Sequence, residues 1–154
     1  MTRREDHYAS FVEHPRYGKR PILTGLNPPE GPGTTFFHWH SPKSCRIAGT
    51  ALKADTSRQL KATYQVSHYF DVERICKRCG RGFIFFAQEQ KHWYEELGFG
   101  LDADCKRCCA CRKKLQFIAR KRKRYEELFH DSARGLDEDR ELIDCCLTMI
   151  EEAV

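Results

Sequence analysis

Two Cys-x-x-Cys pairs are the part of this sequence whose residue types and spacing most clearly suggest chemistry. Cys76 and Cys79 form the first pair, and Cys108 and Cys111 form the second. Four thiolates satisfy the tetrahedral coordination of a structural zinc ion, and two such pairs a few tens of residues apart are its usual sequence signature. We therefore predict that these four cysteines hold one Zn²⁺ ion in a closed, non-catalytic site.

The second pair can be chosen in two ways, because four cysteines lie within the seven residues from Cys105 to Cys111. Cys105 with Cys108 would form a second knuckle ahead of a helix. Cys108 with Cys111 would share one face of a helix's first turn, where the partial positive charge of the helix end favours thiolates. The helical pattern that follows Cys111 favours this second arrangement, which is treble-clef geometry. Cys105 remains an alternative ligand to Cys108 or Cys111.

Other uses of histidine and cysteine are weaker hypotheses. A redox dithiol needs only one Cys-x-x-Cys pair and normally a βαβ context. A second metal site formed by His38, His40 and Cys45 would have only three candidate ligands, and their spacing matches no strong pattern. We expect Cys45, Cys145 and Cys146 to be buried as small apolar side chains.

The composition describes a short chain with a modest core. The 154 residues are 40% hydrophobic, and the formal net charge is +5. This fits one domain, or a small core that a metal helps to hold together. The sequence has no phosphate loop, nucleophile elbow or His-Glu-x-x-His motif, and four cysteine ligands leave no coordination position open for water. We therefore expect that the protein is not an enzyme.

The N-terminal residues 1–7 are strongly polar and do not form the apolar segment that export requires. We therefore expect a cytoplasmic location, in which clustered cysteines stay reduced and serve as metal ligands. No apolar run approaches the roughly 20 residues that cross a bilayer. We expect a soluble protein without a membrane partner.

The pattern of apolar residues and of glycine and proline predicts an α+β fold. We expect strands at 34–40 and 63–73, a short helix at 88–97 ended by Gly98, and two longer helices at 112–129 and 137–154. The predicted organisation has three parts. These are an irregular N-terminal region with short strands (1–69), a small treble-clef-like zinc-binding domain (70–115) and a C-terminal helical hairpin (112–154).

The segment around the cysteines resembles a known bacterial family. The pattern of that family is Cys-x-x-Cys-Gly, a Phe-rich strand, Glu-Gln, an aromatic pair, Gly-Phe, and then Lys-Arg-Cys-x-x-Cys-Arg. Matching groups occur here in the same order: Cys76–Gly80, Phe83–Phe86, Glu89–Gln90, Trp93–Tyr94, Gly98–Phe99 and Lys106–Arg112. Residues 72–114 thus resemble the bacterial domain catalogued as a probable zinc ribbon of treble-clef type. The resemblance implies zinc binding and supports Cys108 and Cys111 as the second pair.

The predicted helix at 112–129 begins with a strongly basic stretch. No acidic residue occurs between positions 112 and 124, and the basic residues are Arg112, Lys113, Lys114, Arg120, Lys121, Arg122, Lys123 and Arg124. A basic helix beside a zinc module is a plausible contact for the phosphate backbone of DNA or RNA. The first functional hypothesis is therefore a nucleic-acid-binding or regulatory module that uses the basic residues from Lys113 to Arg124.

The last predicted helix suggests the alternative. It carries seven acidic residues against one base, Arg140, and Leu142, Cys146 and Met149 mark one side as apolar. If it folds back on the basic helix, its acids neutralise many of the bases, and the two apolar sides pack together. The second hypothesis is therefore a protein-interaction or structural module that contacts a protein partner or forms a homodimer through the C-terminal helices.

Overall fold

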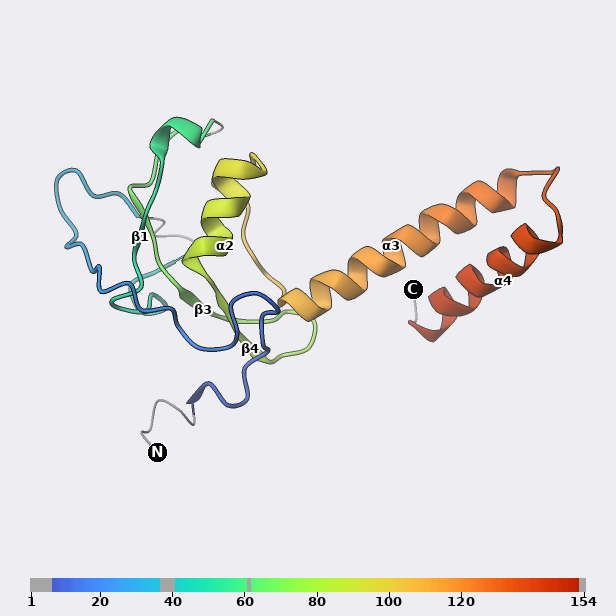
Figure 1. The fold of residues 1–154 in the computed structure, drawn as a ribbon, viewed down its shortest axis with the longest axis horizontal. Coiled ribbons are helices and arrows are strands. Elements are labelled where there is room, and N and C mark those ends of the chain that lie inside the picture. Colours follow the sequence, from blue (N-terminus) through green and yellow to red (C-terminus); the bar gives the residue numbers. More distant parts are fainter. Residues whose placement is uncertain (1–6, 37–40, 61, 153–154) are drawn as a thin grey trace. The chain divides into compact units, whose positions relative to one another are not determined.

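The computed structural model describes residues 7–36, 41–60 and 62–152, and it confirms the predicted α+β class. The chain divides into two compact units, Met1–Cys109 and Ala110–Val154 (Figure 1). The first unit contains two small antiparallel sheets, and the second contains two long helices. Within the described ranges, no helix has both the length and the apolar character that crossing a bilayer would require.

The strands of the first unit pair in sequence order. β1 (Leu52–Lys53) pairs with β2 (His68–Tyr69), and β3 (Val72–Ile75) pairs with β4 (Gly82–Phe85). The longer β3–β4 hairpin is the one that matters for the cysteines, because the turn between its strands contains the first Cys-x-x-Cys pair. All three residues after Gly82 in β4 are buried, so the hairpin is covered on both faces.

The predicted strand at 63–73 is correct only in its second half. Residues before His68 are not in a strand, because the side chain of Gln59 takes the place of a neighbouring strand. Its Oε1 accepts a hydrogen bond from the Val66 amide at 2.9 Å, and its Nε2 donates to the Val66 carbonyl at 3.0 Å. The strand predicted at 34–40 is reduced to an isolated bridge at Thr34, and its residues 37–40 lie outside the described ones.

The predicted helix at 88–97 is confirmed. It consists of α2 (Ala87–Lys91) followed by a π-helical turn, η2 (His92–Glu96). Gly98 adopts a positive φ of 67° just beyond the end, as the predicted glycine cap requires. A short 3₁₀ helix, η1 (Thr56–Arg58), lies earlier in the chain, between β1 and β2.

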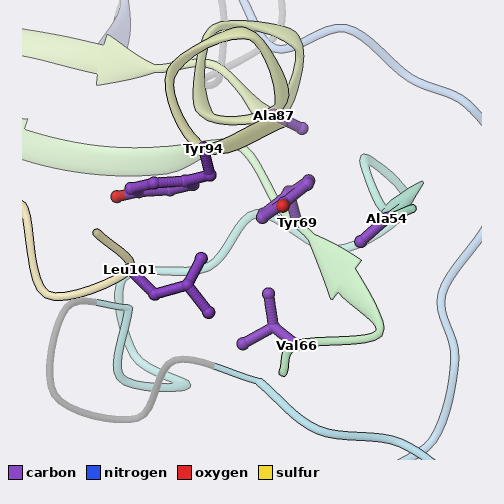
Figure 2. Packing of buried hydrophobic residues seen from close by; sticks show 6 residues of the cluster. All are labelled: Ala54, Val66, Tyr69, Ala87, Tyr94 and Leu101. Atoms are coloured by element: carbon purple, nitrogen blue, oxygen red, sulfur yellow. The ribbon is translucent and has the colours of Figure 1, made fainter. Parts of the chain in front are cut away.

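One apolar cluster joins these elements to the loop that leads to the second cysteine pair (Figure 2). Its buried members are Ala54, Val66, Tyr69, Ala87, Tyr94 and Leu101. The two tyrosine rings lie 5.8 Å apart between centroids, and each hydroxyl has a partner. Tyr69 accepts from Gln59 Nε2 at 2.8 Å, and Tyr94 donates to the Ala103 carbonyl at 2.7 Å. The second bond fixes the chain two residues before Cys105.

The N-terminal region packs against β4 through apolar side chains. Phe11 lies in a cluster with Ile84 and Phe86, and the Val12 amide donates to the Gly82 carbonyl at 2.8 Å. A Cβ atom at Gly82 would lie 2.7 Å from the Phe11 ring, so only glycine allows this approach. The segment that contains Phe11 and Val12 is therefore part of the core of the first unit.

Asp71 connects several segments of the first unit and is fully buried. Its carboxylate accepts hydrogen bonds from the Ile22 amide at 2.8 Å and from the Ala87 amide, at the start of α2, at 2.7 Å. Its own amide donates to Thr50 Oγ1, and its carbonyl accepts from the Ile47 amide. Burial raises the pKa of Asp71 to about 6, although the two amide donors favour the charged form.

This raised pKa predicts how stability depends on pH. The folded state holds the Asp71 proton more tightly than the unfolded state, so this contribution to stability is greatest in acid and is lost as the pH rises through about 6. Between pH values of about 7 and about 5, the wild type should gain about 1 kcal/mol in free energy of unfolding relative to Asp71→Asn. Urea unfolding of both proteins at each pH measures the gain. The same change in free energy of unfolding with pH in the wild type and in Asp71→Asn would contradict it.

The second unit is a helical hairpin formed by α3 (Cys109–His130) and α4 (Leu136–Glu151), which confirms the prediction (Figure 1). Ion pairs join α3 to α4 and to Glu152, the residue directly after it: Lys114–Glu152, Lys121–Asp144 and Arg124–Glu141. Between them, Ile118 and Leu128 of α3 and Cys145 of α4 are buried. Of the three cysteines expected to be buried as small apolar side chains, Cys145 is buried, and Cys45 and Cys146 are only partly buried.

Candidate metal centre

Four cysteine sulfurs converge on one point. The Sγ atoms of Cys76, Cys79, Cys108 and Cys111 all lie within 4.8 Å of one another, and those of Cys79 and Cys108 are 3.9 Å apart. Tetrahedral coordination with metal–sulfur bonds of about 2.3 Å places neighbouring sulfurs about 3.8 Å apart. The number of donors, their chemistry and their separation therefore fit one tetrahedral metal ion.

The first pair is held by a tight turn between β3 and β4. The Cys76 amide donates to the Arg81 carbonyl at 2.9 Å, and the Gly80 amide donates back to the Cys76 carbonyl at 2.9 Å. Gly80 has a φ of 70°, a conformation that other residues rarely adopt. The turn folds the chain so that Cys76 and Cys79 are on the same side, as in a zinc knuckle.

The second pair lies at the beginning of α3. Cys108 directly precedes the helix, and Cys111 is its third residue. A backbone hydrogen bond of 3.0 Å from the Lys77 amide to the Lys106 carbonyl joins the first knuckle to the segment before this pair. Cys76 and Cys108 are buried, Cys111 is partly buried and Cys79 is exposed. The site thus has two sulfurs in the protein interior and one open to solvent.

Backbone amides around the site favour the thiolate form. Burial by itself would raise the pKa of the Cys76 thiol. Hydrogen bonds from the amides of Cys79, Cys108 and Arg78 outweigh this effect and lower the pKa to about 6. Cys76 is therefore mainly ionised at neutral pH and ready to bind a cation.

Cys105 lies outside the cluster. Its side chain is buried, and its Sγ donates to the Arg107 carbonyl at 3.4 Å. Within residues 7–36, 41–60 and 62–152, the four-cysteine cluster is the only group of three or more potential ligands close enough to hold a metal. Cys45 therefore belongs to no such group among the described residues. The other two residues of the predicted second site, His38 and His40, lie outside the described residues.

The basic residues predicted to contact nucleic acid are distributed along α3, and many of them pair with acids. Lys114, Lys121 and Arg124 pair with Glu152, Asp144 and Glu141. Arg122 and Lys123 lie 3.4 and 3.9 Å from glutamates one turn further along the same helix. Lys113 and Arg120 are exposed, and their role, like that of the whole set, stays a prediction.

A second group of basic residues flanks the paired cysteines in the sequence, and it was not among the residues predicted to bind nucleic acid. No acidic residue occurs between residues 76 and 81 or between 105 and 108. The group has five members, all of them exposed: Lys77, Arg78, Arg81, Lys106 and Arg107. We call these residues the knuckle basic group. The signal was present in the sequence, because the five residues lie between or beside the paired cysteines.

The family described as a probable treble clef domain matches residues 70–123. The match covers about a third of the chain and includes all four clustered cysteines. It confirms the resemblance seen in the sequence between residues 72 and 114. Searches among curated proteins and among solved structures gave no match.

The structure predicts that Cys105 and Cys108 have different roles although both are buried. Cys108→Ala should weaken metal binding by more than about 100-fold, because changes that only surround a metal site already cost about 10 to 100-fold. Cys105→Ala should leave the bound metal in place. Metal content of the two purified variants, measured by inductively coupled plasma mass spectrometry, makes the comparison. Equal loss in both variants, or loss only from Cys105→Ala, would contradict this assignment of the ligands.

Proposed function

We propose that this protein binds one structural Zn²⁺ ion through Cys76, Cys79, Cys108 and Cys111 and that it is not an enzyme. The convergence of four sulfurs carries the proposal, because such a donor set is typical of zinc or of iron–sulfur centres, and a treble-clef match favours zinc. Zinc with four cysteine ligands has no position left for water or substrate. None of the nine cysteines, all of which lie among the described residues, forms a disulfide, which supports a location in the reducing cytoplasm.

Removal of zinc should unfold the region around residues 70–115. Structural zinc contributes roughly 10 kcal/mol or more of apparent folding free energy in small zinc modules at neutral pH. A strong chelator should therefore lower the far-ultraviolet circular dichroism signal and speed amide hydrogen exchange in this segment, and added Zn²⁺ should reverse both effects. Cys105→Ala is the matched control and should respond as the wild type does. An unchanged thermal melt after complete removal of zinc would contradict a structural role.

We further propose that the knuckle basic group contacts the phosphate backbone of a nucleic acid. Its residues are exposed, and among the described residues Lys77, Lys106 and Arg107 make no ion pair. They project from two loops that a backbone hydrogen bond joins and that the metal would hold rigid. Phosphate contact requires clustered positive charge on a fixed surface and no sequence code. These features support a nucleic-acid-binding role more strongly than the bases of α3, which are largely paired with acids.

Two double variants, each of which removes two positive charges, distinguish the knuckle basic group from the basic residues of α3. Lys106→Ala with Arg107→Ala should weaken binding to a mixed-sequence DNA duplex or RNA strand and lower the slope of log K against log salt by about 1 to 2. Arg122→Ala with Lys123→Ala removes the same charge from α3 and should change binding much less. Fluorescence anisotropy at several salt concentrations provides the slopes. Absence of binding by the wild type, or the reverse order of the two variants, would overturn the proposal.

A protein-interaction role is the second candidate, and it has independent support in the apolar residues exposed on α4. A thiol redox role has the least support, because all four paired cysteines belong to one cluster. A reversible change in thiol count without loss of metal would favour redox chemistry over both other roles.

A further inference from the structure

Helix α4 has apolar residues on two opposite sides. On the side that faces α3, Cys145 is buried and Leu142 and Met149 are partly buried. The other side carries four large apolar residues that are mostly exposed: Leu136 (80%), Ile143 (59%), Leu147 (53%) and Ile150 (68%). We call these four residues the outer stripe.

The outer stripe is a continuous feature of the helix surface. Its members are seven, four and three residues apart, and at 100° per residue they lie within a narrow sector opposite Cys145. A helix on a protein surface normally has one apolar side and one polar side. The second apolar side of α4 therefore indicates that another surface covers it.

The hairpin is also too small to provide a core of its own. Its two described helices bury only Ile118, Leu128 and Cys145 completely. Two helices alone leave much of their apolar surface in water. The outer stripe exposes on the order of 500 Å² of apolar surface, which is the size of the largest apolar patches on monomeric proteins. A standard protein–protein interface buries about 800 Å² on each partner, so the stripe would form the greater part of one. A second copy that packs its own outer stripe against this one would cover the exposed patch on both copies.

The charges beside the stripe suit a second copy in antiparallel orientation. Arg140, in the second turn of α4, and Glu151, its last residue, lie at the edge of the helix beside the stripe. Among the described residues Arg140 has one ion-pair partner, Asp137, at 3.7 Å, and both side chains are more than four-fifths exposed, so that pair is weak. Glu151 is exposed and has no ion pair among the described residues. A two-fold axis that crosses the outer stripe midway between Ile143 and Leu147 would bring each Arg140 to the Glu151 of the other copy.

We propose that the protein forms a symmetric homodimer in which the outer stripes of two α4 helices pack antiparallel. In this arrangement Ile143 of one copy meets Leu147 of the other, and this contact forms twice because the interface is isologous. The two Arg140–Glu151 pairs favour the antiparallel orientation, because in a parallel pair Arg140 would lie about three helical turns away from the Glu151 of the other copy. The dimer is independent of the proposed contact with nucleic acid.

Sedimentation equilibrium of the full zinc-loaded chain tests the dimer. The wild type should be a dimer, and Leu147→Glu should raise the dimer dissociation constant by at least about 30-fold, because it places a charge at the centre of the interface. Leu60→Glu makes the same change at a residue of the first unit that is 85% exposed, and this control should remain a dimer. A monomeric wild type, or a dimer unaffected by Leu147→Glu, would overturn the proposal. Unchanged circular dichroism verifies that each variant is folded.

Charge exchange tests the orientation. Arg140→Glu and Glu151→Arg should each weaken the dimer about 3 to 10-fold, because each places like charges at both ends of the interface. The double variant restores opposite charges and should recover wild-type affinity. Additive weakening in the double variant would contradict the antiparallel arrangement.

Discussion

The convergence of four thiolates is the constraint on which the first unit depends. The sulfurs join a turn of the β3–β4 hairpin to the first turn of α3, which are separated in the sequence by α2 and a long loop. Closing such a loop costs conformational entropy that a modest apolar core does not easily offset. A metal ion supplies a strong, local and geometrically defined bond in place of extensive packing.

The remaining interactions of the first unit prepare the cysteines for this bond. Asp71 joins the N-terminal segment, the chain before β3 and the start of α2, and so it fixes the hairpin that carries Cys76 and Cys79. Tyr94 holds the loop before Cys105, and amides directed at Cys76 favour its thiolate. Each of these contacts reduces the rearrangement required when a cation binds. A backbone hydrogen bond between Lys77 and Lys106 also joins the two loops that carry the exposed basic residues.

Local patterns made much of this arrangement predictable. The cysteine spacing, the glycines after Cys79 and Leu97 and the helical periodicity each have a local physical cause, and the predicted fold class and helices follow from them. Long-range side-chain contacts were not predictable. Nothing in the sequence indicates that Gln59 replaces a strand beside Val66 or that the buried carboxylate of Asp71 binds distant amides. The outer stripe of α4 was also missed, because an apolar pattern on one side of the helix already explained the hairpin.

X-ray absorption spectroscopy at the zinc edge tests the central claim most directly. The account predicts one zinc ion per chain, surrounded by four sulfur atoms at about 2.3 Å with no nitrogen or oxygen ligand. A first shell that contains nitrogen or oxygen, or a native protein without bound zinc, would contradict it.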